Sequence, residues 1–325
     1  MNRICIFGAG AIGSFIGARL AAHADLQVSA VARGATLKAL DAHGWRLRHA
    51  GETVGGPAIA SADPSDLGEQ DLVVIAVKGP AMGAVAETIA PLIGPETVVL
   101  PAMNGVPWWF GDGMPALGAA PLESVDPGGA IAAAIPARQV LGCVVHAAAI
   151  VAEPGLVEHR MGNGLILGEP DGSMSPRLER VVGLLTDAGF EATASRNIRH
   201  DIWYKLWGNL TMNPVSAMTG ATADRILDDP LVRSFCSAAM REAAEIGRKI
   251  GCTIDQSPDD RHDVTRKLGA FKTSMLQDVE AGRALELDAI VASVSELGRR
   301  LGVDTPFVDG LLGLTRLFAR SRGLY

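Results

Sequence analysis

The stretch RICIFGAGAIG, residues 3–13, decides the fold. Its first five residues are mostly apolar and suit a buried strand, and a glycine-rich turn follows at once. Residues 12–22 are rich in alanine and other small side chains and are predicted to form a helix. A strand, a glycine-rich turn and a helix in this order are typical of the first βαβ unit of a dinucleotide-binding domain.

Each glycine of this G-x-G-x-x-G pattern has a separate physical role. Gly8 permits the tight turn, Gly10 lets the backbone approach a pyrophosphate, and Gly13 allows the helix to pack closely on the strand. The start of the helix adds N–H groups and the positive end of its dipole. The residues predicted to bind the cofactor here are Gly8, Ala9, Gly10, Ala11, Ile12 and Gly13. A glycine-rich turn without a ligand is the alternative interpretation.

The residues after the second predicted strand indicate which nicotinamide cofactor binds. Domains that prefer NAD place an Asp or Glu there, where it bonds the ribose 2′-hydroxyl. This chain has Ala32-Arg33-Gly34 instead, and an arginine forms charge-assisted hydrogen bonds to a 2′-phosphate. NADP(H) is therefore the predicted cofactor, with Arg33 as a contact. An ordinary exposed arginine is the alternative.

Length and composition narrow the class of protein. A chain of 325 residues is long enough for two domains. Its net charge of −7 and the absence of a basic run argue against a nucleic-acid partner and favour small metabolites. The first strand begins without a charged and apolar leader, and no apolar run is long enough to span a membrane. A cytoplasmic protein without membrane contact is expected.

The four cysteines show neither metal-binding nor redox spacing. They are Cys5, Cys143, Cys236 and Cys252. Such scattered cysteines are typical of small core residues in a reducing compartment, so neither a disulfide nor a metal is expected.

Apolar strands alternate with helical segments through the first two-thirds of the chain. Strands are predicted at residues 4–7, 28–31, 72–77, 98–100, 140–150 and 164–167, with a helix at 176–188 and a last strand at 190–194. This rhythm predicts an α/β Rossmann-type domain over residues 1–196, with a doubly wound, mainly parallel sheet. Residues 197–325 are predicted to form an all-helical domain, with helices at 199–218, 230–250, 258–281 and 286–301. This apolar domain could support a homodimer.

Two polar residues fall directly after predicted strands. Lys78 follows the strand at 72–77, and Asn104 follows the strand at 98–100 after a few residues. In an open α/β sheet, ligands lie outside the carboxyl ends of the strands. Lys78 is therefore predicted to contact the cofactor and Asn104 the ribose or the substrate. A solvated lysine and an Asn-Gly turn, chosen because it tolerates positive φ, are the alternatives.

The first predicted helix of the second domain carries a polar stripe in apolar surroundings. Lys205, Asn209 and Asn213 recur every four residues and lie on one side of the helix. A lysine and two amides in apolar company need partners, which a substrate carboxylate and keto oxygen would supply. A lysine in such a place suits the role of general acid in carbonyl reduction. The alternative is a surface lysine with asparagines bonded to the local backbone.

The chain resembles the ketopantoate reductase family over essentially its whole length. The resemblance rests on the glycine-rich turn, Lys78, Asn104-Gly105, the block Lys205-x-x-x-Asn209-x-x-x-Asn213-Pro214, Ser274-Met275-Leu276-Gln277-Asp278, and Glu286-Leu287-Asp288. It implies a Rossmann domain and a helical domain of the 6-phosphogluconate dehydrogenase C-terminal type. It also implies reduction of ketopantoate (2-dehydropantoate) to pantoate with NADPH, a step of pantothenate and coenzyme A biosynthesis.

The same resemblance implies roles for single residues. Lys205 would be the proton donor and Glu286 would orient the reacting groups near the nicotinamide. Asn104, Asn209, Asn213 and Ser274 would hold the substrate. Arg33, Lys78, Asn104, Ala147 and Glu286 would contact the cofactor.

The chain also departs from the family pattern. Thr219-Gly220-Ala221-Thr222 and Ala289-Ile290-Val291-Ala292 stand where the family has further asparagines. Trp108 and Trp109 either wall an enlarged pocket or pack a domain interface. Reduction of another branched or aromatic 2-oxo acid is thus an alternative function. A non-catalytic NADP(H)-binding regulator on the same fold is a second one.

Overall fold

The computed structural model describes residues 1–325, which form two compact units. The first unit comprises Met1–Met103 and Ala130–Ile198, and the second comprises Asn104–Gly129 and Arg199–Tyr325. The division predicted at residues 196 and 197 falls within two residues of the last junction. The segment Asn104–Gly129, which was expected in the first domain, lies in the second unit.

The first unit contains the predicted parallel sheet. Its strand order is β5-β2-β1-β6-β7, and every neighbouring pair is parallel. The strands are β1 (Arg3–Phe7), β2 (Gln27–Val31), β5 (Ile59–Ser61), β6 (Gln70–Ile75) and β7 (Ile93–Pro101). Ile6, Val74 and Leu100 are fully buried, as expected where both faces of a sheet are covered. The predicted α/β fold of this region is confirmed.

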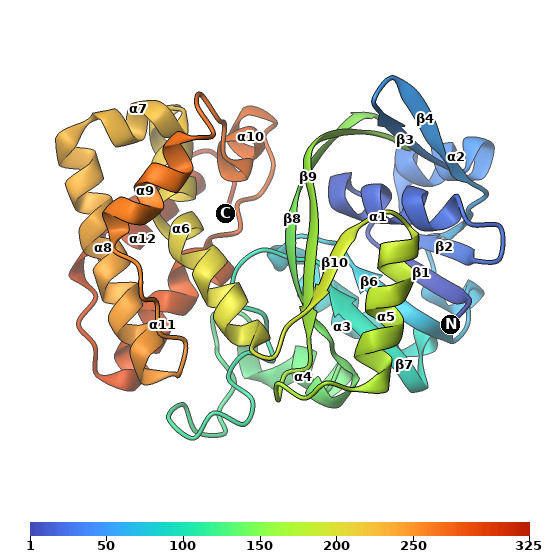
Figure 1. The fold of residues 1–325 in the computed structure, drawn as a ribbon, viewed down its shortest axis with the longest axis horizontal. Helices are drawn as coiled ribbons and strands as arrows, with labels where there is room; N and C mark the ends of the chain where they lie inside the picture. Colours follow the sequence, from blue (N-terminus) through green and yellow to red (C-terminus); the bar gives the residue numbers. More distant parts are fainter. The chain divides into compact units, whose positions relative to one another are not determined.

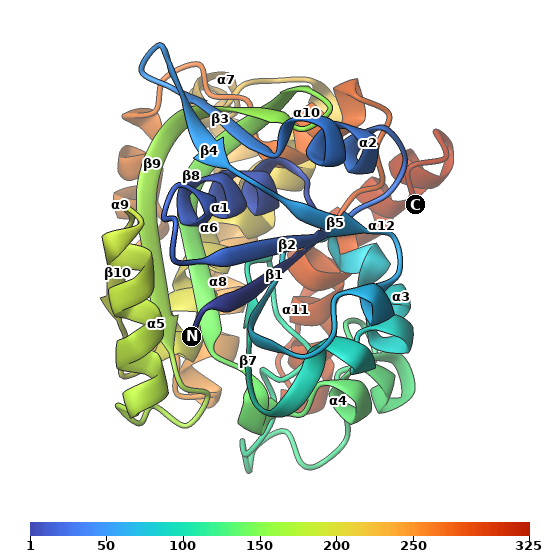
Figure 2. The same ribbon diagram turned by 90° about the vertical axis from the view of Figure 1, so that its right-hand side faces the viewer.

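A second sheet of five strands completes this unit (Figure 2). Its order is β10-β9-β3-β4, with β8 paired to β9. The strands are β3 (Trp45–His49), β4 (Glu52–Gly56), β8 (Gly142–Glu153), β9 (Leu156–Gly168) and β10 (Glu191–Ala194). The unit's helices are α1 (Ala11–Ala21), α2 (Gly34–His43), α3 (Met82–Thr88), α4 (Ala130–Ala134) and α5 (Pro176–Asp187). Trp45 packs its ring where a Cβ on Gly17 of α1 would stand, which brings α1 close to this sheet.

The second unit is built from helices, as predicted (Figure 1). They are α6 (Ile198–Thr219), α7 (Ala223–Asp228), α8 (Pro230–Lys249), α9 (Pro258–Arg266), α10 (Ser274–Glu280), a π-helical segment η6 (Asp288–Ala292), α11 (Ser293–Leu301) and α12 (Pro306–Arg320). The prediction of one helix over 258–281 is wrong, since a break between α9 and α10 contains Gly269 at φ +64°. None of the helices is long and apolar enough to cross a membrane.

Charged side chains of the helices hold the segment Asn104–Gly129 in the second unit. Arg199 Nε donates to the Phe110 carbonyl over 2.9 Å, and Arg300 Nη1 donates to the Ala120 carbonyl over 2.8 Å. The Glu296 carboxylate accepts from the backbone N–H groups of Glu123 (3.0 Å) and Ser124 (2.8 Å). These bonds join positions far apart in the sequence, which explains why composition did not assign the segment to this unit.

The four cysteines are buried, as expected for core residues.

Candidate active site

The glycine-rich turn lies at the carboxyl edge of the parallel sheet. Because β1 stands between β2 and β6, the residues that follow these three strands emerge side by side. Gly8 has φ +101°, and a Cβ there would stand 2.6 Å from Val77 Cγ1. Both the backbone conformation and the neighbouring strand end therefore require glycine at this position.

Gly13 and Gly10 differ in what surrounds them. A Cβ on Gly13 would stand 2.1 Å from the Gly8 carbonyl oxygen, so glycine is needed there for helix α1 to pack on the turn. A Cβ on Gly10 would meet no atom within 4 Å. The protein itself thus gives no steric reason for glycine at position 10, whereas close approach of a ligand to the backbone does.

The start of α1 is suited to an anion. Gly10 is the N-cap and offers no side-chain hydrogen bond, and the first turn has no acidic residue. The first N–H groups of the helix and its dipole therefore remain available to a phosphate. These features fit a dinucleotide pyrophosphate.

The other predicted cofactor residues lie in the same unit. Arg33 is exposed and is the N-cap of α2, directly after β2. Lys78 is half-buried, shortly after β6, and precedes a short 3₁₀ turn. Ala147 is half-buried in β8, at an irregularity in its pairing with β9, and packs on the same apolar core as Ala9. Their contacts with a cofactor stay predictions.

The second unit joins two residues that the sequence singled out separately. Lys205 Nζ donates a hydrogen bond to Asn104 Oδ1 over 2.9 Å, across 101 positions of sequence. Lys205 and Asn104 are both half-buried. The neighbouring Trp203 and Trp207 of α6 are almost fully buried, so their packing fixes the helix that carries Lys205.

The backbone after Asn104 is docked on the segment that follows Glu286. Val106 N–H donates to the Ala289 carbonyl over 2.8 Å. Gly105 has φ +83°, and a Cβ there would stand 2.4 Å from the same Ala289 oxygen. Sequence reasoning missed Ala289 as a docking point, although the glycine after Asn104 was the available signal. Glu286, only 9 % exposed, precedes Ala289 by three residues.

The remaining predicted substrate residues have different surroundings. Asn209 is half-buried on α6, one turn after Lys205. Asn213 is 4 % exposed, and its Nδ2 has no hydrogen-bond partner. A buried amide without a partner is costly, so Asn213 is a good candidate for a ligand contact. Ser274 is exposed at the first position of α10, where the neighbouring Thr273 caps the helix.

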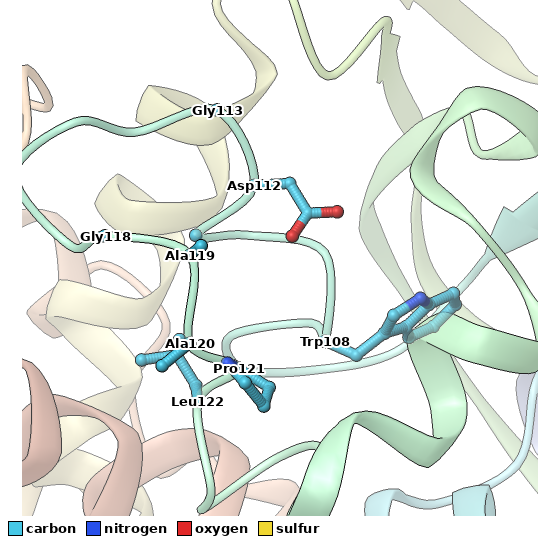
Figure 3. A pocket seen from close by; sticks show the side chains of 9 residues that line it. Trp108, Asp112, Gly113, Gly118, Ala119, Ala120, Pro121 and Leu122 are labelled. Atoms are coloured by element: carbon cyan, nitrogen blue, oxygen red, sulfur yellow. The ribbon is translucent and has the colours of Figure 1, made fainter.

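The two tryptophans of the segment 104–129 are both buried. Trp109 is fully buried, and the Arg199 guanidinium lies 5.7 Å from its ring centroid. Trp108 lines a cavity of about 230 Å³, together with Asp112 and residues 118–122 (Figure 3). Burial raises the pKa of Asp112, against the attraction of Arg199, which lowers it. Trp109 thus serves to pack the second unit, while Trp108 walls a small cavity within it.

Comparison with known proteins agrees with this organisation. The family model described as ketopantoate reductase PanE/ApbA matches residues 4–172, and the model for the C-terminal part of the same family matches residues 197–319. Together with the fold, these matches define a two-domain oxidoreductase. The chain belongs to the ketopantoate reductase family. This is a family of NAD(P)H-dependent oxidoreductases.

Individual relatives match over the full length. A protein of Mesorhizobium japonicum named 2-dehydropantoate 2-reductase is 44 % identical, over 99 % of this chain and 99 % of its own. A crystal structure assigned to the ketopantoate reductases, from Ralstonia solanacearum MolK2, is 56 % identical over 100 % of both chains, with a TM-score of 0.95. The 2-dehydropantoate 2-reductase of Geobacter metallireducens GS-15 is 26 % identical over 97 % of this chain and 99 % of its own, with a TM-score of 0.84.

Proposed function

We propose that the protein reduces 2-dehydropantoate (ketopantoate) to pantoate with NADPH, a step in pantothenate biosynthesis, and that Lys205 is the general acid. The observation that carries the proposal is the 2.9 Å hydrogen bond between Lys205 Nζ and Asn104 Oδ1. This bond joins two residues of the second unit, and both have side chains that can donate a hydrogen bond to the reacting carbonyl. The names of the full-length relatives support the choice of substrate.

Lys205 moves the proton in this reaction. NADPH, when bound, supplies the hydride that the C2 carbonyl carbon receives. The Lys205 ammonium donates a proton to the carbonyl oxygen, which becomes the hydroxyl of pantoate. Asn104 holds the ammonium through its Oδ1, so its amide nitrogen remains a donor for the substrate. Glu286 orients the ammonium or the new hydroxyl.

The substrate's polar groups are bound by the other predicted residues. The buried Nδ2 of Asn213 lacks an acceptor, and a substrate oxygen would supply one. Asn209, one turn closer to Lys205, adds a second amide on the same side of α6. Ser274 offers an exposed hydroxyl as a further donor.

The cofactor is held by the first unit. The N–H groups around Gly10 bind the pyrophosphate, because nothing in the chain caps them. Arg33 pairs with the 2′-phosphate and favours NADPH over NADH. Lys78, the Ala147 backbone, Asn104 and Glu286 complete the predicted contacts. Four buried cysteines suit the reducing cytoplasm, where we place the reaction.

The test is the oxidation of NADPH by the purified protein with ketopantoate. The same assay is repeated with NADH and with a panel of branched and aromatic 2-oxo acids. We expect ketopantoate and NADPH to give the highest kcat/KM. A higher kcat/KM with another 2-oxo acid would move the proposal to that substrate, and binding of NADPH without turnover of any of them would overturn it.

A further inference from the structure

Two histidines of the first unit meet where strand β3 ends. His49 is the last residue of β3, His159 lies in β9, and their Nδ1 atoms are 2.8 Å apart. β3 pairs in parallel with β9, and the register Arg48↔Glu158 places His49 opposite His159 at the next position (Figure 2). The two residues are 110 positions apart in the sequence, so their spacing could not reveal them as a pair. We call them the histidine pair.

The hydrogen bonds of the histidine pair fix where its protons lie. His159 Nε2 is 2.5 Å from the Gly162 carbonyl oxygen, which can only accept, so this nitrogen carries a proton. The Nδ1 of a neutral His159 is then bare, and His49 Nδ1–H donates the hydrogen bond between the rings. An imidazole that donates its other N–H to a backbone carbonyl is the usual arrangement of a metal-ligating histidine. His159 thus presents an oriented lone pair.

The ring of His159 is held by an aromatic contact. It stacks on Phe15 of α1, with the ring centroids 4.9 Å apart and the planes 10° from parallel. Phe15 is fully buried and contacts Phe190 edge to face, at 5.2 Å between centroids. His49 is exposed, and its ring is tilted by 44° to that of His159. One ring of the pair is therefore fixed, and the other can turn toward a shared ligand.

A carboxylate lies on the same side of the sheet. The two-residue turn Ala50-Gly51, with φ of +50° and +86°, joins β3 to β4 and places Glu52 directly opposite His49. Residues opposite one another on neighbouring strands point to the same face. Glu52 is exposed, so its side chain can swing toward a cation beside His49 and offset part of its charge.

We propose that the histidine pair binds one divalent transition-metal cation of the Cu²⁺ or Ni²⁺ type, with Glu52 and water as further ligands. An imidazole nitrogen lies about 2.0 Å from such a metal, as it does from zinc. Two donors at a right angle are then about 2.8 Å apart, which matches the spacing of the two Nδ1 atoms. Tetrahedral Zn²⁺ needs about 3.3 Å between donors, so the square-planar or tetragonal geometry of Cu²⁺ and Ni²⁺ fits better.

Binding requires a change of tautomer but no net loss of a proton. The Nδ1 proton of His49 leaves to solvent and its Nε2 takes up another, so the ring stays neutral and Nδ1 becomes a ligand. The ring then turns so that its Nδ1 lone pair points at the cation instead of at His159. The bound cation joins β3 to β9, and it stabilises the folded chain because an unfolded chain does not bring the two rings together.

The first test titrates the full-length protein, free of any affinity tag, with Ni²⁺ in a calorimeter. We expect one equivalent to bind. His49→Ala should weaken binding about tenfold or more, because even the loss of a partner behind a metal ligand costs about 10- to 100-fold. His159→Phe should do the same, although it keeps an aromatic ring against Phe15.

His43→Ala is the matched control, because His43 is an exposed histidine at the end of α2. It should bind Ni²⁺ like the wild type. The proposal is overturned if the wild type binds no Ni²⁺, if His49→Ala and His159→Phe both bind it as tightly as the wild type, or if His43→Ala weakens binding as much as they do. The last result would assign the binding to surface histidines in general.

A second test counts the nitrogen ligands in the wild type, so it does not depend on the folding of a variant. One equivalent of Cu²⁺ should give a tetragonal electron paramagnetic resonance spectrum with coupling to two imidazole nitrogens. Glu52→Gln should keep both couplings and bind Cu²⁺ more weakly, since it removes only the carboxylate. Cu²⁺ should also raise the Tm of the wild type but not that of His159→Phe. Coupling to one nitrogen or none in the wild type would exclude the histidine pair as the site.

Discussion

Lys205 is the residue on which the proposed proton transfer depends. Lys205→Ala should lower kcat about 10²- to 10⁴-fold, the usual contribution of a general acid. The affinity for NADPH should change little, because the predicted pyrophosphate and 2′-phosphate contacts lie in the first unit. Steady-state kinetics and a fluorescence titration with NADPH measure the two effects.

Two further variants sharpen this test. Lys205→Arg keeps a cation beside Asn104, but a guanidinium does not release its proton near neutral pH, so kcat should stay low. Lys249→Ala is the control, since Lys249 Nζ donates to the Leu301 carbonyl elsewhere in the same unit. Turnover by Lys205→Ala at the wild-type rate would remove Lys205 from the mechanism.

Arg33 is the residue that should separate NADPH from NADH. It is exposed at the start of α2, so Arg33→Ala should leave the fold intact. A hydrogen bond to a charged group contributes about 1.5–3 kcal/mol, which corresponds to roughly a 10- to 150-fold rise in KM for NADPH. KM for NADH should not change, because NADH lacks the 2′-phosphate. Arg48→Ala, at an exposed arginine of β3, serves as the control. An equal rise for both cofactors would contradict the assignment.

At the scale of elements, two glycines of the turn between β1 and α1 have different roles. Gly13 is needed for folding, whereas Gly10 is predicted to bind the cofactor. Gly10→Ala should preserve Tm, because Gly10 has φ −81° and open space around its Cβ position. The added methyl group would occupy the place of the pyrophosphate, so the affinity for NADPH should fall. Gly13→Ala should lower the free energy of unfolding by about 1–3 kcal/mol, because its Cβ would collide with the Gly8 carbonyl.

Thermal unfolding followed by circular dichroism measures the stability of both variants, and a titration with NADPH measures the affinity for the cofactor. A Gly10→Ala variant that is folded and binds NADPH as tightly as the wild type would show that the turn does not hold the pyrophosphate.

Local signals made some elements predictable and left others hidden. The strand, turn and helix at residues 3–21 could be predicted because the apolar run, the glycine spacing and the small helical residues follow one another directly in the sequence. In contrast, β3 is only five residues long, and Arg46 pairs with Leu156, 110 positions away. Its alternating side chains do not reveal that partner. The break between α9 and α10 was also missed, because a single glycine is a weak signal to end a helix.

In the candidate site, too, the sequence predicts single residues but not the contacts between distant segments. Lys205 and Asn104 were both predicted from the sequence, but their contact was not. Asn104 reaches the helical unit because Gly105 and Val106 dock on the Ala289 backbone. That contact depends on tertiary packing between segments far apart in sequence, which neither periodicity nor spacing describes.

At the scale of the whole molecule, the long segment that follows β7 places Asn104, a predicted site residue, in the second unit. The segment Asn104–Gly129 is held there by Arg199, Glu296 and Arg300. Burial of the Glu296 carboxyl opposes its ionisation. The hydrogen bonds from Ser124 and Glu123 and the charge of Arg300 outweigh this effect and lower the pKa of Glu296.

A lowered pKa in the folded protein makes this attachment sensitive to acid. The stabilisation is fully present above the pKa of Glu in the unfolded chain, about 4.3, and is lost as the pH falls through the folded value. At neutral pH, Glu296→Gln should lower the free energy of unfolding by about 1–3 kcal/mol, since it breaks hydrogen bonds to a charged acceptor. The difference in Tm between variant and wild type should shrink as the pH falls below about 4.

Glu245→Gln provides the control for this comparison. Hydrogen bonding to Arg248 also lowers the pKa of Glu245, but this pair is exposed on α8 and should contribute little to stability. Its Tm should therefore follow that of the wild type at every pH. If the Tm difference for Glu296→Gln were the same at pH 7 and in acid, the ionised carboxylate would not be what holds the segment. The neutral bonds of Arg199 and Arg300 to backbone carbonyls would then be its main attachment.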